Sequence, residues 1–347
     1  MKKGSKILPT GKLPHDVLHK FLDRYTAKSE EVVVGAQIGE DAAVIDIGDK
    51  YLLAKTDPIT FVTDEIGYYA ININANDIAC MGGIPKWFLA TILLPEGKTT
   101  EKIADSIFSQ LSDACKQLDV VFCGGHTEIT QGIDKPIVVG HMLGEVEKDK
   151  LVTSGQAQVG DDVILTKGIA IEATSIIARE SAEKLASLFS SELVEQCKNY
   201  IYDPGISVFK EARLAVSFEH IHAMHDPTEG GLATGLIELA KAANVGLRVE
   251  QDMIEVLPEC KLLCDVFDLD PMGLIASGSL LIVCQPSVSP LLLEKFEEHN
   301  VYAGRIGKIM PPDFGYKMIS FDGEEWELSC YSQDEIIKYF KKLEKEK

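Results

Sequence analysis

The sequence predicts an α+β protein with two domains, on three observations. Strand-like and helix-like segments alternate along the chain, and they form two blocks of similar size. The length of 347 residues suits two hydrophobic cores, because single domains usually hold roughly 100–200 residues. With 46% hydrophobic and 25% charged residues, the composition is that of a soluble globular protein. We place the domains at residues 1–155 and 156–330, and a charged tail at 331–347.

The first block begins with an amphipathic pattern that predicts a helix over residues 12–24. Short runs rich in Val, Ile and Leu then predict strands, and longer segments with apolar residues three or four positions apart predict helices. In chain order the predicted strands are EVVVGA, DAAVIDI, YLLAKTD, WFLATILLP, DVVFC and IVVGHMLGEV, and the helices among them are ININANDIACMGG and TTEKIADSIFSQLSDACKQL.

The second block opens after the polar turn VTSGQAQVGD, which interrupts the apolar pattern. Its predicted helices cover residues 171–187 and 206–217 and the segment GGLATGLIELAKAA. Its predicted strands are GDDVILTKG, HIHAMH, VGLRVE and GSLLIVC. The terminal stretch IIKYFKKLEKEK is predicted to be a charged helix or a frayed end.

Charge and cysteine usage limit the partners and the compartment. The net charge of −20 argues against nucleic acid and anionic membrane as partners. No apolar run is long enough to span a bilayer, and MKKGSKILPTGKL lacks the apolar core of a signal peptide. The eight cysteines include no CxxC pair, which fits a reducing compartment, and we expect Cys260 and Cys264 to serve core packing. We therefore expect a cytoplasmic protein.

The segment ININANDIACMGG, residues 71–83, carries unusual polar residues for a helix. Asn and Asp are poor interior helix formers because their short side chains compete for backbone hydrogen bonds. Helical spacing puts Asn72 near Asn76 and Asn74 near Asp77, so the polar groups form two edges separated by apolar residues. Such a helix is expected to be buried, and buried polar groups need partners. Those partners are either neighbouring loops or a ligand or metal.

Two further features favour the ligand. Asp41 in IGEDAAVID and Asp57 in LLAKTDPIT each lie at a strand boundary, where a side chain can point into a cleft. Several aspartates from separate segments suit a hard cation such as Mg²⁺. In GGHTEIT, Gly124 and Gly125 let the backbone approach a ligand closely, and successive amides there can form an anion-binding nest.

Five ordered motifs resemble those of the AIR synthase superfamily: GEDAAV, KTDPIT, NANDIACMGG, GGHTE and HDPTEGGLATGLIELA. This superfamily also includes selenophosphate synthetase, thiamine monophosphate kinase and the hydrogenase maturation factor HypE. The resemblance covers nearly all of residues 12–310 and is nearest to HypE and AIR-synthase-related proteins, while GGHT is also similar to the selenophosphate synthetase pattern.

The resemblance implies a two-domain AIR-synthase-like fold and a homodimer. Amino-terminal domains would pair their sheets into a dimeric β-barrel, with a ferredoxin-like α+β carboxy-terminal domain packed behind each. The implied cofactors are ATP and Mg²⁺, and an unidentified acceptor would complete the reaction. By motif, the implied metal ligands are Asp41, Asp57, Asp77 and Asp226, and the implied nucleotide-cleft residues are Asn74, Asn76, Gly124, Gly125, His126, Thr127 and Glu128.

Several charged residues are candidates for roles in chemistry. We expect His126, Lys55 and Asp226 to be catalytic, and Lys167 is a further cation to examine near the nucleotide. Glu128 and Glu229 are candidate acids or helix-terminus groups. In HIHAMH the residues His220, His222 and His225 either bind a transition metal or simply form a strand that leads into HDPTEGG, and we favour the strand.

The expected function is Mg-ATP-dependent phosphoryl transfer that activates an oxygen of a small molecule or an amide-like group. Two alternatives stay open: a HypE-type hydrogenase maturation protein, or a nucleotide-binding regulatory or assembly protein without turnover. The HypE reaction uses a carboxy-terminal cysteine, whereas this chain ends in KYFKKLEKEK and its last cysteine is Cys330. HypE also has an arginine where this chain has Glu229 and an acidic residue near the position of Ser277. We therefore expect removal of residues 336–347 to change ATP binding little.

Overall fold

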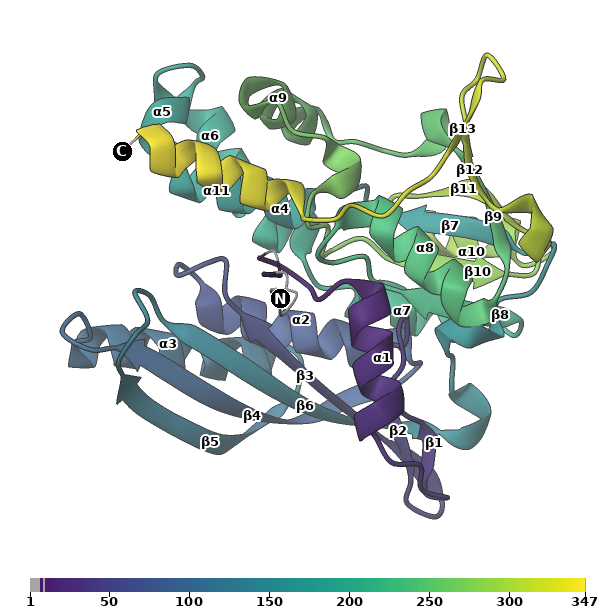
Figure 1. Ribbon diagram of the computed structural model, residues 1–347, viewed down its shortest axis with the longest axis horizontal. Coiled ribbons are helices and arrows are strands. Elements are labelled where there is room, and N and C mark those ends of the chain that lie inside the picture. The colour runs from purple at the N-terminus through teal and green to yellow at the C-terminus, as the bar shows by residue number, and fades with distance from the viewer. Residues whose placement is uncertain (1–6, 9, 347) are drawn as a thin grey trace, which may run out of the picture.

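Two β-sheets with helices packed on them make up the protein, as a computed structural model describes it for residues 7, 8 and 10–346 (Figure 1). The first sheet has six strands in the order β1-β2-β3-β6-β4-β5 and comes from the first half of the chain. The second has seven strands in the order β13-β12-β9-β11-β7-β10-β8 and comes from the second half. The α+β prediction is therefore confirmed.

The first sheet is antiparallel except at one edge, where β4 and β5 run parallel and are connected through helix α3. Alternate residues of β6 are buried because one face of the sheet packs against helix α2. Helices α2 and α3 lie side by side on that face. The elements, after helix α1 (His15–Tyr25), are β1 (Val32–Val34), β2 (Ala43–Asp46), β3 (Lys50–Ile59), α2 (Ile66–Cys80), β4 (Ile84–Pro95), α3 (Glu101–Gln117), β5 (Val121–Thr130) and β6 (Ile137–Glu147).

The second sheet is covered on both faces. Helix α8 packs on one face, and α7 and α10 pack on the other, so the central strands β7 and β10 are buried throughout. The strands are β7 (Asp162–Thr166), β8 (Ile221–His225), β9 (Gly246–Glu250), β10 (Leu281–Cys284), β11 (Ala303–Met310), β12 (Tyr316–Ile319) and β13 (Glu325–Glu327). The covering helices are α7 (Phe209–Ala215), α8 (Gly231–Ala243) and α10 (Ser289–Glu298).

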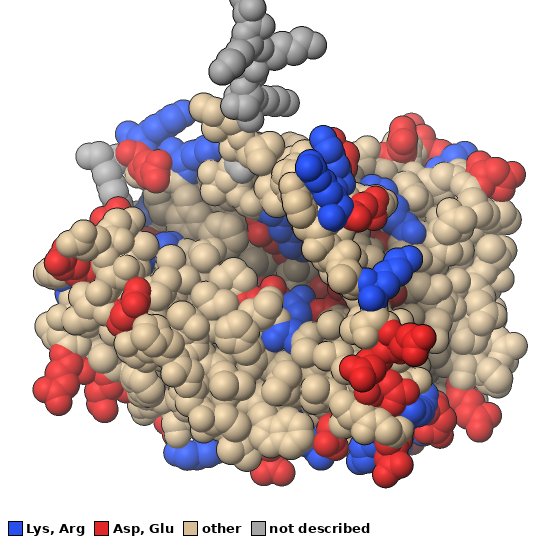
Figure 2. Space-filling view, turned by 60° about the horizontal axis from the view of Figure 1, so that its bottom comes forward, with Lys and Arg blue, Asp and Glu red and all other residues tan. Residues whose placement is uncertain are grey.

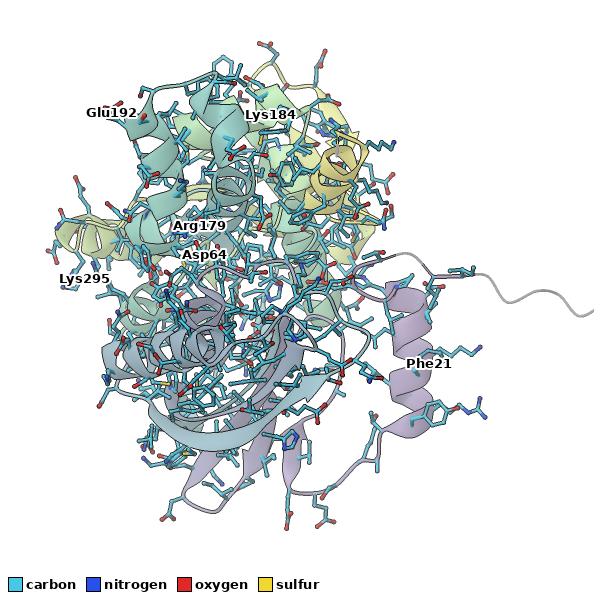
Figure 3. All side chains as sticks on the ribbon, turned by 90° about the vertical axis from the view of Figure 1, so that its left-hand side faces the viewer. Phe21, Asp64, Arg179, Lys184, Glu192 and Lys295 are labelled. Carbon is cyan, nitrogen blue, oxygen red and sulfur yellow. The ribbon has the colours of Figure 1, made fainter. Side chains whose placement is uncertain are left out.

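Helix α2 lies between the two halves of the chain, and every residue of it except Tyr68 is buried. One hydrophobic cluster extends from the first sheet through α2 to a helical group in the second half. That group consists of α4 (Ile171–Glu180), α5 (Ala182–Ala186), α6 (Ser191–Asn199), α9 (Pro258–Phe267) and α11 (Glu335–Glu346). An ion pair from Arg179 of α4 to Asp64 adds a polar contact between the halves (Figure 3). The halves therefore share a core.

The carboxy-terminal tail is a packed helix, α11, and not a frayed end. Ile336 and Tyr339 are fully buried, and the ring of Phe340 stacks on Phe61 with centroids 6.2 Å apart. Its lysines and glutamates lie mainly on the outer face, which explains why the sequence reads as charged. Removal of residues 336–347 therefore exposes core side chains, and the expectation that it changes ATP binding little stays a prediction.

Other differences from the sequence prediction are local. The predicted helix over 171–187 is divided at Ser181 into α4 and α5, and the helix predicted from residue 206 begins at Phe209. Strand β5 continues through GGHTEIT, so this segment is not the predicted nest. Helices α6, α9 and α10 and strands β11–β13 were not predicted.

Among the helices described here, none has both the length and the apolar character that crossing a bilayer requires.

Candidate active site

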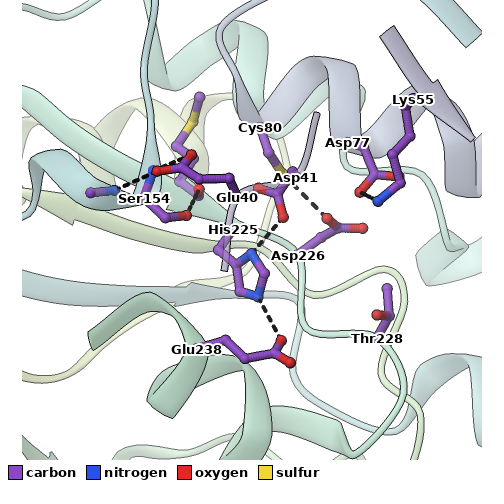
Figure 4. A network of polar contacts seen from close by, with 12 residues as sticks. Glu40, Asp41, Lys55, Asp77, Cys80, Ser154, His225, Asp226, Thr228 and Glu238 are labelled. Carbon is purple, nitrogen blue, oxygen red and sulfur yellow. Dashed lines mark hydrogen bonds and ion pairs between the residues drawn. The ribbon is translucent and has the colours of Figure 1, made fainter. Parts of the chain in front are cut away.

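Three buried aspartates meet where the two halves of the chain join. Asp41 precedes β2, Asp77 lies on α2, and Asp226 follows β8 (Figure 4). They are only 5%, 4% and 1% exposed, and the Oδ2 atom of each has no hydrogen-bond partner in the structure. Buried carboxylate oxygens normally have partners, so three unpartnered ones at one place indicate a binding site for a cation or for a hydrogen-bond donor. We call Asp41, Asp77 and Asp226 the acid cluster.

Strand β3 contributes a cation and a further acid to the cluster. The Nζ atom of Lys55 lies 2.9 Å from Oδ1 of Asp77 and 3.4 Å from Oδ2 of Asp57. Burial by itself lowers the pKa of Lys55, but Asp77, Asp57 and Asp41 outweigh it and raise this pKa above its ordinary value. Burial, with repulsion from Asp41, raises the pKa of Asp226 to about 7. One lysine therefore does not balance the negative charge of the cluster.

His225 is held between two acids at the edge of the cluster. Its Nδ1 lies 2.6 Å from Oδ1 of Asp41, and its Nε2 lies 3.5 Å from Oε2 of Glu238 on α8. Burial lowers the pKa of His225, but Asp41 and Glu238 raise it well above the ordinary value. A protonated His225 donates from Nδ1 to Asp41 and forms an ion pair with Glu238, so it fixes the orientation of Asp41. His222 instead contacts Asp161, 2.7 Å away.

Two members of the acid cluster, Asp41 and Asp226, lie close enough together to share a hard cation. Ligand atoms of Asp41, Cys80 and Asp226 lie within 4.8 Å of one another, and this is the only such metal-capable group among the described residues. Burial, with repulsion from Asp226, raises the pKa of the Cys80 thiol well above its ordinary value, which favours the neutral thiol over a thiolate. The remaining donors are carboxylate oxygens, which Mg²⁺ prefers. The histidines of β8 do not form a second metal-capable group within the described part of the chain.

The asparagines of α2 contact the protein backbone instead of lining the cleft. Asn74 and Asn76 are fully buried. Asn74 accepts from the Asp57 amide at 2.9 Å and donates to the Ala70 carbonyl at 2.9 Å. Asn76 donates to the Ile206 carbonyl at 2.8 Å and accepts from the Val208 amide at 2.9 Å, which ties α2 to the second half. Asn76 thus bonds a neighbouring loop, whereas Asn74 bonds strand β3 and its own helix and positions Asp57.

The GGHTE segment lies away from the acid cluster within one chain. In the sheet register Asp57 pairs with Gly140, Gly140 with Ala90, and Ala90 with Gly125. Three strand spacings of about 4.8 Å place Gly125 about 14 Å from Asp57. Gly125 has φ of +145°, and a Cβ there would lie 1.9 Å from the Ala90 carbonyl oxygen, so only glycine permits this close pairing.

The side chains that follow Gly125 face solvent on the edge strand β5. The side chain of His126 is 67% exposed, and its Nε2 lies 3.2 Å from Oε2 of Glu128. Thr127 is also exposed. One chain therefore does not bring Gly124, Gly125, His126, Thr127 and Glu128 to the acid cluster.

Lys167 also lies apart from the cluster. Its ammonium donates to the carbonyls of Gly205 and Ser207 at 3.1 and 2.6 Å, and it pairs with Glu211 at 3.2 Å. With every contact directed to buried protein groups, Lys167 is an internal anchor and not a nucleotide contact.

A cavity of about 400 Å³ lies between the halves and reaches Asp57. Figure 2 shows one hollowed face of the molecule in which acidic and basic side chains gather. Glu172, on the first turn of α4, lines the cavity and was missed by sequence reasoning. Burial raises its pKa to about 7, with Ser277 acting in the opposite direction. Glu172 lies in an ordinary helical pattern, so no local signal sets it apart.

The chain matches the family model of the AIR synthase related protein in two parts. The amino-terminal domain of that family covers residues 39–146, and its carboxy-terminal domain covers residues 158–316.

Individual relatives agree with this match. A hydrogenase expression/formation protein of Methanocaldococcus jannaschii is 27% identical over 85% of both chains. The carbamoyl dehydratase HypE of Rhizobium leguminosarum is 25% identical over 90% of this chain and 87% of its own. A crystal structure of the hydrogenase maturation protein HypE in complex with ATP superimposes with a TM-score of 0.70 at 22% identity, over 94% of this chain and 97% of that one. With family models matching both halves, the chain belongs to the AIR synthase related family.

Proposed function

We propose that this protein is an Mg-ATP-dependent enzyme that transfers a phosphoryl group to an oxygen of a small molecule or an amide-like group. The observation that carries the proposal is the acid cluster, whose three orphaned oxygens lie beside Lys55 and near a cavity large enough for a second substrate. Phosphoryl transfer needs positioning and charge neutralisation more than covalent chemistry from the protein. A related protein that binds ATP and one that dehydrates a carbamoyl group support this reaction class.

In this proposal Asp41, Asp57, Asp77 and Asp226 hold Mg²⁺, and Asp57 also lines the cavity. The bound cation supplies charge neutralisation for the phosphates. The ammonium of Lys55, now paired with Asp77 and Asp57, adds a second positive charge at the same place. His225 orients Asp41 and Asn74 orients Asp57, so both acids are fixed before ATP binds.

A homodimer completes the proposal. Strand β5 is an exposed edge, and its apolar side chains Val121 and Ile129 are 59% and 62% exposed. Edge strands of this kind are normally covered, and pairing with a second copy into a dimeric β-barrel covers both. In such a dimer the partner supplies the GGHTE segment to the nucleotide cleft, which gives His126 and Glu128 the role that one chain does not provide.

We further propose that the second domain is ferredoxin-like, because of its strand order. Strands β11, β7, β10 and β8 are neighbours in that order and antiparallel, and helices connect β7 to β8 and β10 to β11. This arrangement suits the β-α-β-β-α-β pattern of ferredoxin-like domains.

The test of function measures binding and turnover separately. Calorimetry with ATP is expected to show binding in the presence of Mg²⁺ and little without it, and ADP release is expected when the correct acceptor of a metabolite panel is added. Binding without ADP release across the panel favours the alternative of a regulatory protein. A carbamoyl or cyano adduct on half-buried Cys330, found by mass spectrometry, favours the HypE-type reaction.

A further inference from the structure

The cavity between the halves is lined by apolar side chains and by acidic ones. We call the apolar part, formed by Ile59, Phe61, Val62, Ile73 and Ile275, the apolar wall. Its volume of about 400 Å³ falls in the range of small-molecule sites, which run from about 300 to 1,000 Å³. The loop after β3 contributes apolar side chains, α2 contributes Ile73, and the second half contributes Ile275. The acidic groups that line the cavity are Asp57, Glu172 and Glu229, and Lys12 is the only basic one among the described lining residues.

The charged groups at the cavity differ in whether they have hydrogen-bond or ion-pair partners. The backbone amide of Lys12 donates to Oε1 of Glu229 at 3.0 Å, and its ammonium lies 3.4 Å from Oγ1 of Thr228 and 3.8 Å from Oε1 of Glu238. Asp57 is paired with Lys55. Glu172 is 5% exposed, and its Oε2 atom has no hydrogen-bond partner. Glu172 is therefore the one carboxylate of these three that has a buried oxygen, Oε2, without a hydrogen-bond partner.

We propose that this cavity binds an organic cation, so that the acceptor of the reaction carries an ammonium group that donates to Oε2 of Glu172 while its hydrocarbon part lies against the apolar wall. This inference rests on the proposed function for the identity of the ligand as the acceptor. An anionic acceptor is disfavoured because three carboxylates face it and the ammonium of Lys12 points to other partners. A neutral acceptor leaves the buried Glu172 without a counter-charge.

Metal binding at Glu172 fits the cavity less well. Hard cations take six or more oxygen ligands, whereas the lining of the cavity as a whole is largely apolar. An ammonium needs only a few acceptors and brings its own apolar carbons. The raised pKa of Glu172, about 7, is the behaviour of a buried carboxyl that lacks the counter-charge such a ligand supplies.

Three matched probes test the charge preference on the full chain without ATP. They are n-butylammonium, butan-1-ol and butyrate, which share a four-carbon skeleton and differ in charge. Ligand-observed NMR titration is expected to show n-butylammonium binding at least about tenfold more tightly than the other two. Equal affinity for the three probes, tighter binding of butyrate or butan-1-ol, or no binding of n-butylammonium overturns the proposal.

Variants locate the binding in the cavity. Glu172→Gln is expected to weaken n-butylammonium binding by about tenfold or more, whereas Glu294→Gln, the same change on an exposed part of α10, leaves it unchanged. Retained affinity in Glu172→Gln overturns the proposal. Thr60→Trp, which fills the cavity from an exposed lining position, decides the question if Glu172→Gln fails to fold. Its expected result is the same loss, and unchanged affinity again overturns the proposal.

Separate measurements distinguish the two proposals. If n-butylammonium binds in the cavity but Mg-ATP does not bind, the proposed function fails and the cation site stands. If Mg-ATP binds and n-butylammonium does not, the cation site alone fails.

Discussion

At the scale of single residues, the site depends on pairs in which one group fixes another. Asn74 holds the backbone of Asp57, and His225 holds the carboxylate of Asp41. Such support keeps acids in place although they repel one another, because each has a neutral or positive neighbour that opposes its displacement. The residues that touch a ligand are therefore a minority of those on which its binding depends.

Replacing Asp57 tests the metal assignment. Because its side chain is about one-third exposed, Asp57→Asn should leave the fold intact while it removes one charge from the shared cation site. Calorimetry is expected to show Mg-ATP affinity reduced by about tenfold or more. The exposed residue Asp105 on α3 provides the matched control, Asp105→Asn, which should bind as the wild type does. Equal affinities of the two variants would remove Asp57 from the site.

The pKa of Glu172 leads to a pH dependence of stability. Its folded-state pKa of about 7 exceeds the unfolded value of 4.5, so the folded protein binds more protons between these pH values. The free energy of unfolding then falls as pH rises through this window. Glu172→Gln cannot ionise, so its free energy of unfolding lacks this decrease. Free energies of unfolding from thermal melts without ligand are expected to rise for the variant relative to the wild type between about pH 5 and pH 8, by on the order of 2 kcal/mol. A constant difference across that range contradicts the raised pKa, and Glu294→Gln serves as the control.

At the scale of elements, α2 and α11 show how apolar faces decide position. Helix α2 carries apolar residues between its two polar edges and is buried on all sides, whereas α11 has one apolar face and lies on the surface of the core. Charge at the end of a sequence thus says little about burial, because a helix of this length needs only a few apolar side chains to dock.

Replacing Tyr339 tests whether α11 is part of the fold. Its ring packs edge-to-face on Phe267 with centroids 5.1 Å apart, and its hydroxyl lies 2.8 Å from Oγ of Ser181. Tyr339→Ala is expected to lower the free energy of unfolding in urea by about 3–5 kcal/mol, as for other buried aromatic residues. Lys345→Ala, an exposed position of the same helix, should have little effect. Comparable stability of the two variants would show that α11 contributes little to the fold.

Sequence reasoning succeeded where the information was local. Asp41 lies just before β2, Asp57 lies within β3 two residues from its end, and Asp77 lies in a helix with several poor helix formers, so each stands in a local pattern that the sequence shows. The partners of Asn76 lie 130 and 132 residues away, and no local pattern reveals them. Gly124 and Gly125 look like a turn, but the close approach to Ala90 uses them within a strand. Glu172 belongs to the site only through tertiary packing.

At the scale of the whole molecule, the first sheet holds two parts of the proposed nucleotide site apart. The acid cluster lies at the junction of the halves, whereas the segment GGHTE lies on the outer strand β5. Within one chain these features are separate, and a second copy is the proposed way to join them.

An edge substitution tests the homodimer. Light scattering of the wild type at micromolar concentration is expected to give the mass of two chains. Ile129→Lys puts a charge on the exposed edge of β5 and is expected to give monomers and weaker Mg-ATP binding together. Leu291→Lys, a similarly exposed apolar position on α10, should remain dimeric. A wild-type monomer contradicts the proposal, and a monomeric variant with unchanged ATP affinity shows that the partner adds nothing to the site.

The bond from Asn76 to Ile206 also governs how the chain acquires its structure during synthesis. Helix α2 needs a carbonyl that lies 130 residues further along the chain. At roughly 5–20 residues per second, a ribosome takes about 7–26 s to add those residues. Through that interval the apolar surface of α2 that packs on the second half has no partner, and it is a natural binding site for chaperones that recognise exposed hydrophobic segments. Ribosome-associated nascent chains that end before residue 206 should therefore be captured by such chaperones, and chains that include the whole second half should be released.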